Sequence, residues 1–458
     1  MGGAEDVLTA NLAPGPGGNP ITDQLRPFEE DPLRFLLSMR EAHGNVVRLH
    51  LWPQLCHLIS DPNSIRYVLS THAQNYHGPP AMQRGRLRDR QRLLGGGQQS
   101  LSDEFQLTRR MEKLGSEVFH QKQVETFAPI MVRDTAAMLR RWQKHAKSGE
   151  PFDAERDLLT LTQTILGDTL FHADLSRIGP TIANIMASGA PQSRVSVFQQ
   201  LEQAQMEANR PWLEAMEILN QFVADLVEKR RRQGPGDKDL LSILLFDRDE
   251  LTGEFLPEQK VLEAAWAFLI AGHSAVASLL TWTCFLLSQH QDIVLKVRAE
   301  VDAALGSRPP TTAHLPKLPY THMVLQESMR LYPPVWMFAP RMTTKDDSIE
   351  GYRIPARSII LISPYVLHRH PDYWERPEEF EPARFAGSTP AAYLPYGAGP
   401  WGCIGSQFGM LEARLVLPML LQHYEWELKP GYQVELDPQL ALRPRHGLPI
   451  AVRARSRS

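Results

Sequence analysis

The chain has 458 residues, of which 43% are apolar and 22% charged, a composition typical of a folded globular protein. Its net charge of −3 provides no basic field that would attract nucleic acid. Three cysteines argue against a disulfide framework and for a reducing compartment, and the sequence has neither an apolar run long enough to span a membrane nor a signal-peptide core. We therefore expect a cytoplasmic protein without a membrane span.

The first part of the chain alternates between loops and short elements. Residues 1–19 are rich in glycine and proline and predict a flexible arm. Residues 45–59 alternate apolar and polar side chains around Pro53, which predicts a hairpin, and residues 63–69 predict a short helix. The arginine-rich stretch 78–103 predicts a loop that serves either as a functional lid or as a solvated face.

The remainder of the chain is mostly helical. Residues 104–232 follow an interrupted helical pattern, 257–289 predict a long helix of roughly eight to nine turns, and 312–331 predict another. Residues 348–363 alternate around turn residues and predict a small sheet. We expect one mostly α domain over 1–458, with small β-sheets from both ends of the chain.

Cys403 lies in a glycine-rich loop, LPYGAGPWGCIG, followed by a predicted helix. A lone cysteine is more often a small buried apolar residue. Here, glycines let the backbone approach a flat ligand, and backbone N–H groups and the helix start favour a thiolate. The sequence offers no second Cys or His at zinc-ligand spacing. A lone thiolate facing open space is the ligand set of a heme iron that activates oxygen.

A second motif places two opposite charges on one helix face. Glu327 and Arg330 are three residues apart in LQESMRLYPP, and Arg384 follows Pro382 in FEPARF. At a surface, such a pair contributes little to stability. A buried cluster would need all three charges, because an unpaired buried charge is costly. Its expected role is to lock the helix against the loop that carries Cys403.

Together these motifs resemble those of the cytochrome P450 family, and the resemblance covers nearly the whole chain. The family's E-x-x-R and P-x-R-F motifs and its heme loop occur in the same order and at matching separations. The resemblance implies a mostly α fold with small β-sheets, shaped as a triangular prism around the long helix 257–289. It also implies heme b (iron-protoporphyrin IX) bound through Cys403 as the metal ligand. The matching heme-loop positions hold Tyr396, Gly399, Trp401, Cys403 and Gly405.

The central helix departs from the family pattern at its catalytic positions. In AGHSAVAS, Ala271 and Gly272 are retained, which implies room for a ligand. The family's acid and threonine, which relay protons, are Ser274 and Ala275 here, and a methyl group donates no proton. Ser274 could replace part of the relay through a water. His273 could supply a proton if it faces inward, although a solvent or packing histidine is the commoner case.

The groups that anchor heme propionates in the family are also altered. Trp401 replaces an arginine or histidine and offers one uncharged N–H. The predicted helix around 104–119 lacks the family's W-x-x-x-R, although Arg109 and Arg110 could substitute. Arg341 matches a propionate-binding arginine. We expect weaker heme retention, since a shielded Arg–carboxylate pair contributes roughly 1.5–3 kcal/mol.

The first functional hypothesis is a heme-thiolate oxidoreductase of the monooxygenase type. Its substrate would be small to medium and apolar, with terpenoids of secondary metabolism as candidates. No reductase sequence follows Cys403, so we expect ferredoxin and ferredoxin reductase, or a similar donor, to supply electrons. By resemblance, the substrate pocket would be lined by residues for which core packing is an equal alternative: Trp266, Phe268, Val335, Trp336 and Phe338.

The second hypothesis is a repurposed scaffold, an isomerase, dehydratase or terpene cyclase that holds heme weakly or not at all. All departures fall where oxygen chemistry and heme anchoring need particular residues, and an aromatic pocket can stabilise a carbocation. Against it, Cys403, the Glu327–Arg330 pair and the glycine loop persist, and no D-D-x-x-D motif is present. A third hypothesis, a binding protein without turnover, has no feature in its favour.

Overall fold

The computed structural model divides the chain into two compact units, and each unit combines two separated stretches of sequence. The β-rich unit comprises Met1–Arg92 and Gln326–Cys403, and the helical unit comprises Leu93–Leu325 and Ile404–Ser458. The prediction of a single domain over 1–458 stays a prediction. The structure describes residues 11–51, 54–78, 113–115, 117–179, 181, 210–235, 239–249 and 252–455.

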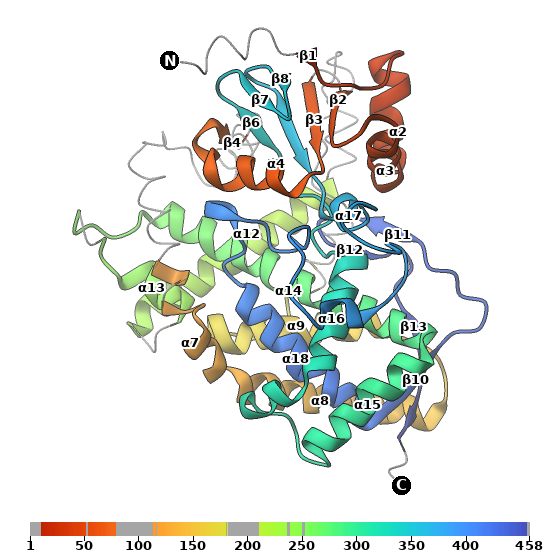
Figure 1. The fold of residues 1–458 in the computed structure, drawn as a ribbon. Helices are drawn as coiled ribbons and strands as arrows, with labels where there is room; N and C mark the ends of the chain where they lie inside the picture. The colour runs from red at the N-terminus through yellow and green to blue at the C-terminus, as the bar shows by residue number, and fades with distance from the viewer. Residues whose placement is uncertain are drawn as a thin grey trace. The chain divides into compact units, whose positions relative to one another are not determined.

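A five-stranded sheet is the centre of the β-rich unit. Its order is β2-β3-β9-β6-β4, with β2 (Val46–Leu51), β3 (Gln54–Ile59), β9 (Ile359–Ile362), β6 (Arg341–Thr343) and β4 (Tyr76–His77). β2 and β3 pair antiparallel, as the alternating sequence predicts, and β3 pairs parallel with β9. Figure 1 shows the red and orange N-terminal strands of this unit beside its cyan strands. Sheet pairing thus joins the two sequence segments of the unit.

One face of this sheet packs on α3 (Pro32–His43). Phe35 and Leu36 of α3 form an apolar cluster with side chains of β2, β3 and β9, among them Leu49 and Leu58. These strand residues alternate with residues of the opposite sheet face, among them His57 and Ile59, which are also buried. Pro53, the expected turn residue, lies outside the described residues.

Other elements of the β-rich unit are short. Within the flexible arm expected over residues 1–19, Asn11 and Leu12 form β1 and pair with β8, whereas residues 1–10 lie outside the described residues. The helix expected over 63–69 is α4, continued by a π-helical turn. The short elements are η1 (Pro20–Leu25), α2 (Arg26–Glu30), α4 (Pro62–Arg66), η2 (Tyr67–Thr71), η3 (Ala73–Asn75), β7 (Asp347–Ile349), β8 (Tyr352–Ile354), α17 (Pro364–Leu367), η6 (Pro382–Phe385) and η7 (Gly399–Trp401).

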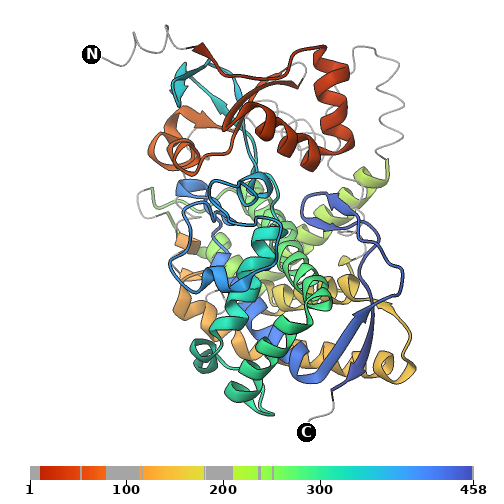
Figure 2. The ribbon, with the colours of Figure 1, turned by 45° about the vertical axis from the view of Figure 1, so that its right-hand side comes forward.

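The helical unit is built around α14 (Glu258–Gln289), which confirms the long helix expected over 257–289. α14 contacts α9 (Ala154–Leu166), α12 (Arg210–Gln233) and α18 (Ser406–His423), as Figures 1 and 2 show. Of the described helices, α14 alone is long and apolar enough to cross a membrane, yet 76% of its apolar window is buried inside the protein. Protein packing therefore accounts for its apolar character.

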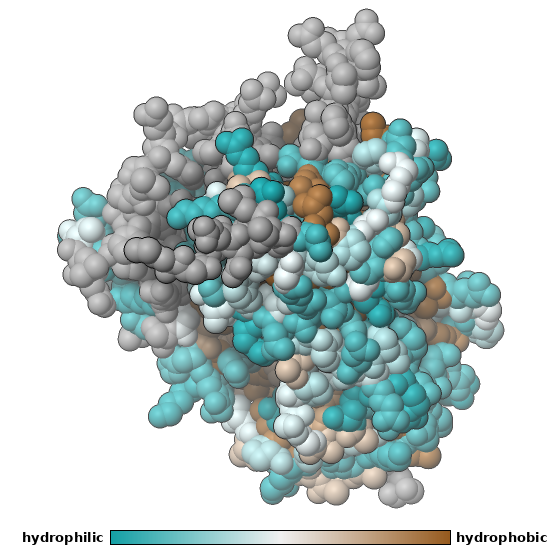
Figure 3. Space-filling view, turned by 45° about the horizontal axis from the view of Figure 1, so that its top comes forward, coloured by the Kyte–Doolittle hydropathy of each residue, from teal (hydrophilic) through white to brown (hydrophobic). Residues whose placement is uncertain are grey.

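The described surface agrees with this interpretation. Among the described residues visible in Figure 3, hydrophilic side chains prevail and apolar ones occur in small scattered groups. Scattered apolar residues are normal on a globular surface.

The segment 312–331 forms two elements where the sequence predicts one helix. A 3-10 helix, η5 (Thr312–Lys317), precedes α16 (Pro319–Leu331), and Leu318 between them has non-helical angles of φ −120° and ψ 46°. Proline disfavours the helical conformation of the residue before it, so Pro319 separates the two elements.

The remaining elements complete the helical unit. β13 pairs with β10 and β5 in one sheet, and β11 pairs with β12 in another. The bounds are α7 (Gln121–Thr126), α8 (Ala128–Ser148), β5 (Phe152–Asp153), η4 (Gly167–Phe171), α13 (Leu240–Phe246), α15 (Gln291–Leu305), β10 (Tyr424–Leu428), β11 (Leu436–Pro438), β12 (Leu442–Pro444) and β13 (Pro449–Ala454).

Candidate active site

The loop that presents Cys403 is closed by its own backbone. Leu394 O accepts a hydrogen bond from Gly397 N at 3.3 Å, and Tyr396 O accepts one from Cys403 N at 2.9 Å. Gly399 has φ +62°, and a Cβ built there would lie 2.2 Å from the carbonyl oxygen of Leu69. Only glycine fits this position, because both the backbone conformation and the close approach exclude a side chain. The glycine-rich sequence therefore fixes the path of the loop.

Cys403 is also the cysteine best suited to bind a metal from outside the core. It is exposed, whereas Cys56 and Cys284 are buried. Burial raises the pKa of each of these two thiols to about 12, so both stay protonated near neutral pH. The thiolate is the form of cysteine that binds metals. The exposed thiol of Cys403 thus fits the axial ligand of a heme.

A fully buried charge cluster lies in the same unit, at the end of α16. Glu327 and Arg330 are both 0% exposed, and two hydrogen bonds join them: Arg330 Nε to Glu327 Oε2 at 2.7 Å and Nη2 to Oε1 at 2.8 Å. Arg384 Nε donates to Glu327 Oε1 at 2.9 Å. The structure thus brings together the three residues that the sequence analysis singled out.

The cluster also binds the segment that precedes the cysteine loop. Arg330 donates from Nη1 to the carbonyl oxygens of His368 (2.8 Å) and Pro377 (2.6 Å), and from Nη2 to that of Glu379 (3.0 Å). Every N–H-bearing nitrogen of this guanidinium therefore donates to an oxygen. A buried ion pair stabilises a fold only when such additional hydrogen bonds offset its desolvation.

Arg341 lies on β6, where the resemblance expects a residue that binds a heme propionate. Its guanidinium is half-buried, and burial lowers its pKa because the charged form loses solvation. An arginine is suited to bind a carboxylate through charge-assisted hydrogen bonds. The propionate-binding role of Arg341 stays a prediction. Arg109 and Arg110, the other expected cationic anchors, lie outside the described residues, as does the side chain of Trp401.

The departures in the central helix fall on the middle of α14. Ser274 is buried, and its hydroxyl donates to Ile270 O at 3.4 Å, a long bond along the helix. Gly272 was expected to leave room for a ligand, but a Cβ there would lie 2.7 Å from Leu166 Cδ1 of α9. A side chain at this position would displace the end of Leu166, and the expected room for a ligand stays a prediction. Ala271 is exposed, and the side chain of His273 lies outside the described residues.

The predicted substrate-pocket residues belong to two different units. On α14, the ring of Phe268 stacks on Phe119 with centroids 5.6 Å apart, and Trp266 Nε1 is buried without a hydrogen-bond partner. In the β-rich unit, Trp336 packs against the apolar cluster beside α3, which favours core packing for this residue. Val335 is 37% exposed, and Phe338 is half-buried. Their role in substrate binding stays a prediction.

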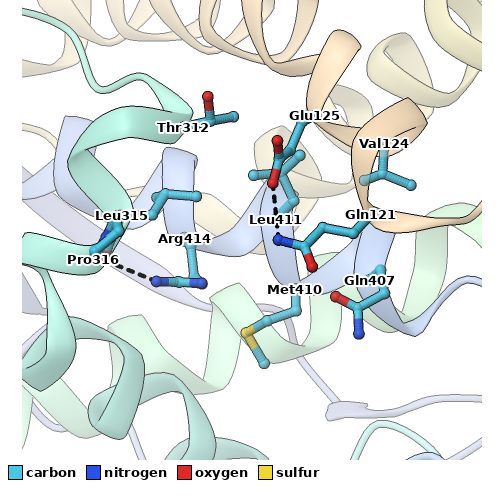
Figure 4. Close-up of a pocket in the computed structure, with 10 residues that line it drawn as sticks. All are labelled: Gln121, Val124, Glu125, Thr312, Leu315, Pro316, Gln407, Met410, Leu411 and Arg414. Carbon is cyan, nitrogen blue, oxygen red and sulfur yellow. Dashed lines mark hydrogen bonds between the residues drawn. The ribbon is translucent and has the colours of Figure 1, made fainter.

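A separate open pocket of about 180 Å³ lies within the helical unit (Figure 4). Arg414 donates to Leu315 O at 2.8 Å on one wall, and Gln121 donates to Glu125 at 3.0 Å on another. None of the predicted site residues lines it. The lining residues are Gln121, Val124, Glu125, Thr312, Leu315, Pro316, Gln407, Met410, Leu411 and Arg414.

Comparison with known proteins identifies the family. A cytochrome P450 family model matches residues 14–448, and the chain belongs to this family. It is 32% identical to cyclooctatin synthase of Streptomyces melanosporofaciens over 93% of this chain and 92% of the relative. It is 31% identical to cyclooctat-9-en-7-ol 5-monooxygenase of the same organism, over 91% and 89%. Pentalenene oxygenase of Streptomyces avermitilis is 27% identical over 92% of each chain.

A solved structure supports the fold. The crystal structure of the cytochrome P450DA heme domain superposes with a TM-score of 0.82, covers 98% of each chain and is 24% identical in sequence. The expected mostly α fold with small sheets and a long central helix is thus confirmed. The protein is an oxidoreductase of the monooxygenase type, and its cofactor is heme b.

Proposed function

We propose that the protein hydroxylates or otherwise oxygenates a small to medium terpenoid. The cyclooctatin and pentalenene enzymes to which the chain is similar over nine-tenths of its length support this substrate class. The observation that carries the proposal is the exposed thiol of Cys403, held in a loop whose path requires a glycine at Gly399. The apolar residues Phe268 and Val335 suit a hydrocarbon skeleton better than a charged substrate.

The reaction consumes one dioxygen, two electrons and two protons. One oxygen atom enters a C–H bond of the substrate to give an alcohol, and the other leaves as water. Heme, when bound, supplies the redox-active iron at which dioxygen is reduced. The electrons come from a protein donor, in this proposal ferredoxin with its reductase. We place this protein and its electron donor in the cytoplasm, where the three cysteines of the chain stay reduced.

The chain's own residues hold the cofactor and manage the protons. In this proposal Cys403 ligates the iron, Tyr396, Gly399 and Gly405 shape the loop, and Arg341 binds a propionate. We propose that Trp401, which replaces a charged anchor of the family, contributes its N–H to heme retention. Arg109 and Arg110 are neighbours of a further anchoring position and would substitute for it.

Proton delivery must differ from the family pattern. Ala275 has no hydroxyl, and the hydroxyl hydrogen of Ser274 is directed to Ile270 O. We propose that water, held in part by Ser274 or by a hydroxyl group of the substrate, carries the protons. A substrate that already bears an alcohol, as cyclooctat-9-en-7-ol does, fits this requirement.

The same departure favours a second candidate function, non-oxidative chemistry on a terpenoid as an isomerase, dehydratase or cyclase. It needs neither a proton relay nor electrons. An aromatic pocket that stabilises a carbocation would suffice. The two candidates differ in whether dioxygen and an electron donor are consumed.

Isotopically labelled dioxygen separates these candidates. The purified protein is incubated with NADPH, ferredoxin, ferredoxin reductase and either cyclooctat-9-en-7-ol or pentalenene, and products are analysed by mass spectrometry. We expect one labelled oxygen atom per product and no product without NADPH. An unlabelled, rearranged product formed without NADPH would contradict the oxidative proposal and support the second candidate. Cys403→Ser is the matched control, and its product should disappear.

A further inference from the structure

His368 occupies a position that the sequence analysis did not single out. Its side chain is completely buried, between the end of α16 and the start of the cysteine loop. Its Nε2 accepts a hydrogen bond from Leu394 N at 3.1 Å. The imidazole stacks on Tyr393, with ring centroids 5.4 Å apart and planes 24° from parallel. His368 therefore contacts the first residue of the loop through its ring edge and the preceding residue through its ring face.

The bond to Leu394 continues into the hydrogen bonds that close the cysteine loop. Leu394 donates its N–H to His368 and accepts from Gly397 through its carbonyl group. Two residues after Leu394, Tyr396 accepts the bond from Cys403 N. Without an acceptor at His368, the N–H of Leu394 would lose its hydrogen-bond partner in a part-buried setting, which weakens the closure of the loop. The loop would then be free to move away from the His368 ring.

The other end of His368 is fixed by the buried charge cluster. Its backbone carbonyl accepts a hydrogen bond from Arg330 Nη1 of α16 at 2.8 Å. His368 is therefore bonded to α16 through its backbone and to the cysteine loop through its side chain. Because Nε2 is an acceptor, the ring proton must lie on Nδ1. Burial, with the charge of Arg330 next, lowers the pKa of His368 to about 3, which keeps the ring neutral and Nε2 able to accept.

We propose that His368 is a positioning residue for Cys403: its Nε2 fixes the backbone of Leu394, and thereby the loop that presents the sulfur to the heme. This inference rests on the proposed function of Cys403 as the iron ligand. His368 then connects the cluster of Glu327, Arg330 and Arg384 to the loop, because it is hydrogen-bonded to both Arg330 and Leu394. Loss of the acceptor should loosen the iron–sulfur bond without removing either partner.

Two variants of His368 separate the hydrogen bond from packing. His368→Leu removes the acceptor and fills much of the space, whereas His368→Gln places an amide oxygen close to the position of Nε2. His370→Leu is the matched control. His370 is also buried in this segment and bonds to Asn45 Oδ1 at 2.7 Å, with no hydrogen bond to the cysteine loop. The holoproteins are reduced, treated with carbon monoxide and followed by their Soret absorption, and the exchange of the Leu394 amide is measured with deuterium.

We expect His368→Leu to exchange the Leu394 amide about 10-fold faster, the ratio that corresponds to about 1.4 kcal/mol. We also expect the thiolate-type Soret band of His368→Leu to be replaced, faster than in the wild type, by the band of a heme without a thiolate ligand. His368→Gln and His370→Leu should keep the wild-type band and exchange. The proposal is overturned if folded His368→Leu keeps both the wild-type Soret band and the wild-type exchange rate of the Leu394 amide. It is also overturned if His370→Leu loses the thiolate band as fast as His368→Leu does.

The two proposals fail in different ways. If His368→Leu does not fold, His368→Gln decides: a retained thiolate band supports the role of His368, and a folded variant that loses this band contradicts it. If the wild-type holoprotein itself lacks a thiolate band, the proposed function of Cys403 fails. This result is distinct from a failure at His368, which can be diagnosed only when the wild-type holoprotein shows the thiolate band.

Discussion

Glu327 and Arg384 are 57 residues apart in the chain, yet Arg384 Nε donates to Glu327 Oε1 at 2.9 Å. The same carboxylate oxygen accepts from the backbone N–H of Glu381 at 2.9 Å. Glu327 is completely buried, so its charge depends on these donors and on Arg330. The cluster thus ties α16 to the segment around η6, inside the β-rich unit.

Substitution of Glu327 by Gln should therefore destabilise the protein strongly. It leaves Arg330 buried without its counter-charge, and breaking a buried pair in this way costs about 3–5 kcal/mol. Urea unfolding of the holoprotein measures the loss. As a control, Glu379→Gln breaks a largely exposed pair with Arg376, and its effect should stay below about 1 kcal/mol. Equal effects of the two substitutions would contradict the account of the cluster.

His57 of β3 should be a site where an apolar residue is more stable than the native one. Its side chain is completely buried, and neither ring nitrogen has a hydrogen-bond partner. A buried polar group without a partner costs about 1–3 kcal/mol, so His57→Leu should raise the free energy of unfolding by an amount in this range near neutral pH. His446→Leu, at an exposed position, is the control and should change little. A destabilised His57→Leu would contradict the prediction.

The same substitution should also change the pH dependence. Burial, the largest cause, lowers the pKa of His57 from 6.5 to about 4. Between about pH 6.5 and pH 4 the imidazole of His57 binds a proton in the unfolded chain but not in the folded chain. The free energy of unfolding of the wild type therefore decreases as the pH falls through this window. The advantage of His57→Leu over the wild type should grow across this window. A difference that stays constant from pH 7 to pH 4.5 would mean that the ring does not titrate as described.

The buried Glu412 of α18 should make the protein less stable as the pH rises, opposite to the effect of His57. It is completely buried, and neither carboxylate oxygen has a hydrogen-bond partner. Burial, with the nearby Asp134 next, raises its pKa well above 4.5. A carboxyl group whose pKa is raised by folding contributes fully to stability at a pH below its pKa in the unfolded chain. This contribution is lost as the pH rises toward its pKa in the folded chain. Glu412→Gln does not titrate, so its stability relative to the wild type should rise by about 1.4 kcal/mol per pH unit above 4.5.

Unfolding in urea at several pH values checks this slope. Glu375→Gln, with a side chain 88% exposed, provides the control and should show no such trend. A stability difference between Glu412→Gln and wild type that is independent of pH between 4.5 and 7 would contradict the assignment of a protonated buried acid.

Arg341→Leu tests whether this arginine holds a propionate. The loss of a shielded Arg–carboxylate pair, worth about 1.5–3 kcal/mol, should raise the rate of heme loss by roughly 10- to 100-fold. Transfer of heme to an excess of apomyoglobin measures this rate. Arg353→Leu is the control: it lies in the same unit and pairs with Asp346. Heme loss from Arg341→Leu at the wild-type rate would remove Arg341 from the proposed site.

Sequence reasoning reached the parts of the fold and site that depend on local patterns. The apolar length of residues 257–289 predicts α14, and the alternation around Pro53 predicts β2 and β3. The three charges of the cluster were found because Glu327 and Arg330 share a helix face and because Arg384 belongs to a recognisable motif. Each of these signals lies in one continuous stretch of sequence.

The parts that were missed depend on contacts between distant segments. Leu166 packs beside Gly272 although it lies more than a hundred residues earlier, and no local pattern of α14 indicates this contact. His368 bonds to Leu394, 26 residues away, and no periodicity indicates such a pair. The orphan nitrogens of His57 likewise follow only from its complete burial in the sheet. Such features become visible only when the tertiary packing is known.

The account depends most on an iron–sulfur bond at Cys403, and one spectrum tests it directly. The purified protein, supplied with heme, is reduced with dithionite and exposed to carbon monoxide, beside the variants Cys403→Ser and Cys284→Ser. We predict the strongly red-shifted Soret band of a thiolate-ligated heme in the wild type and in Cys284→Ser, whose buried sulfur is not a ligand, and its absence in Cys403→Ser. A wild-type protein without iron, or a Cys403→Ser variant that retains the red-shifted band, would contradict the account.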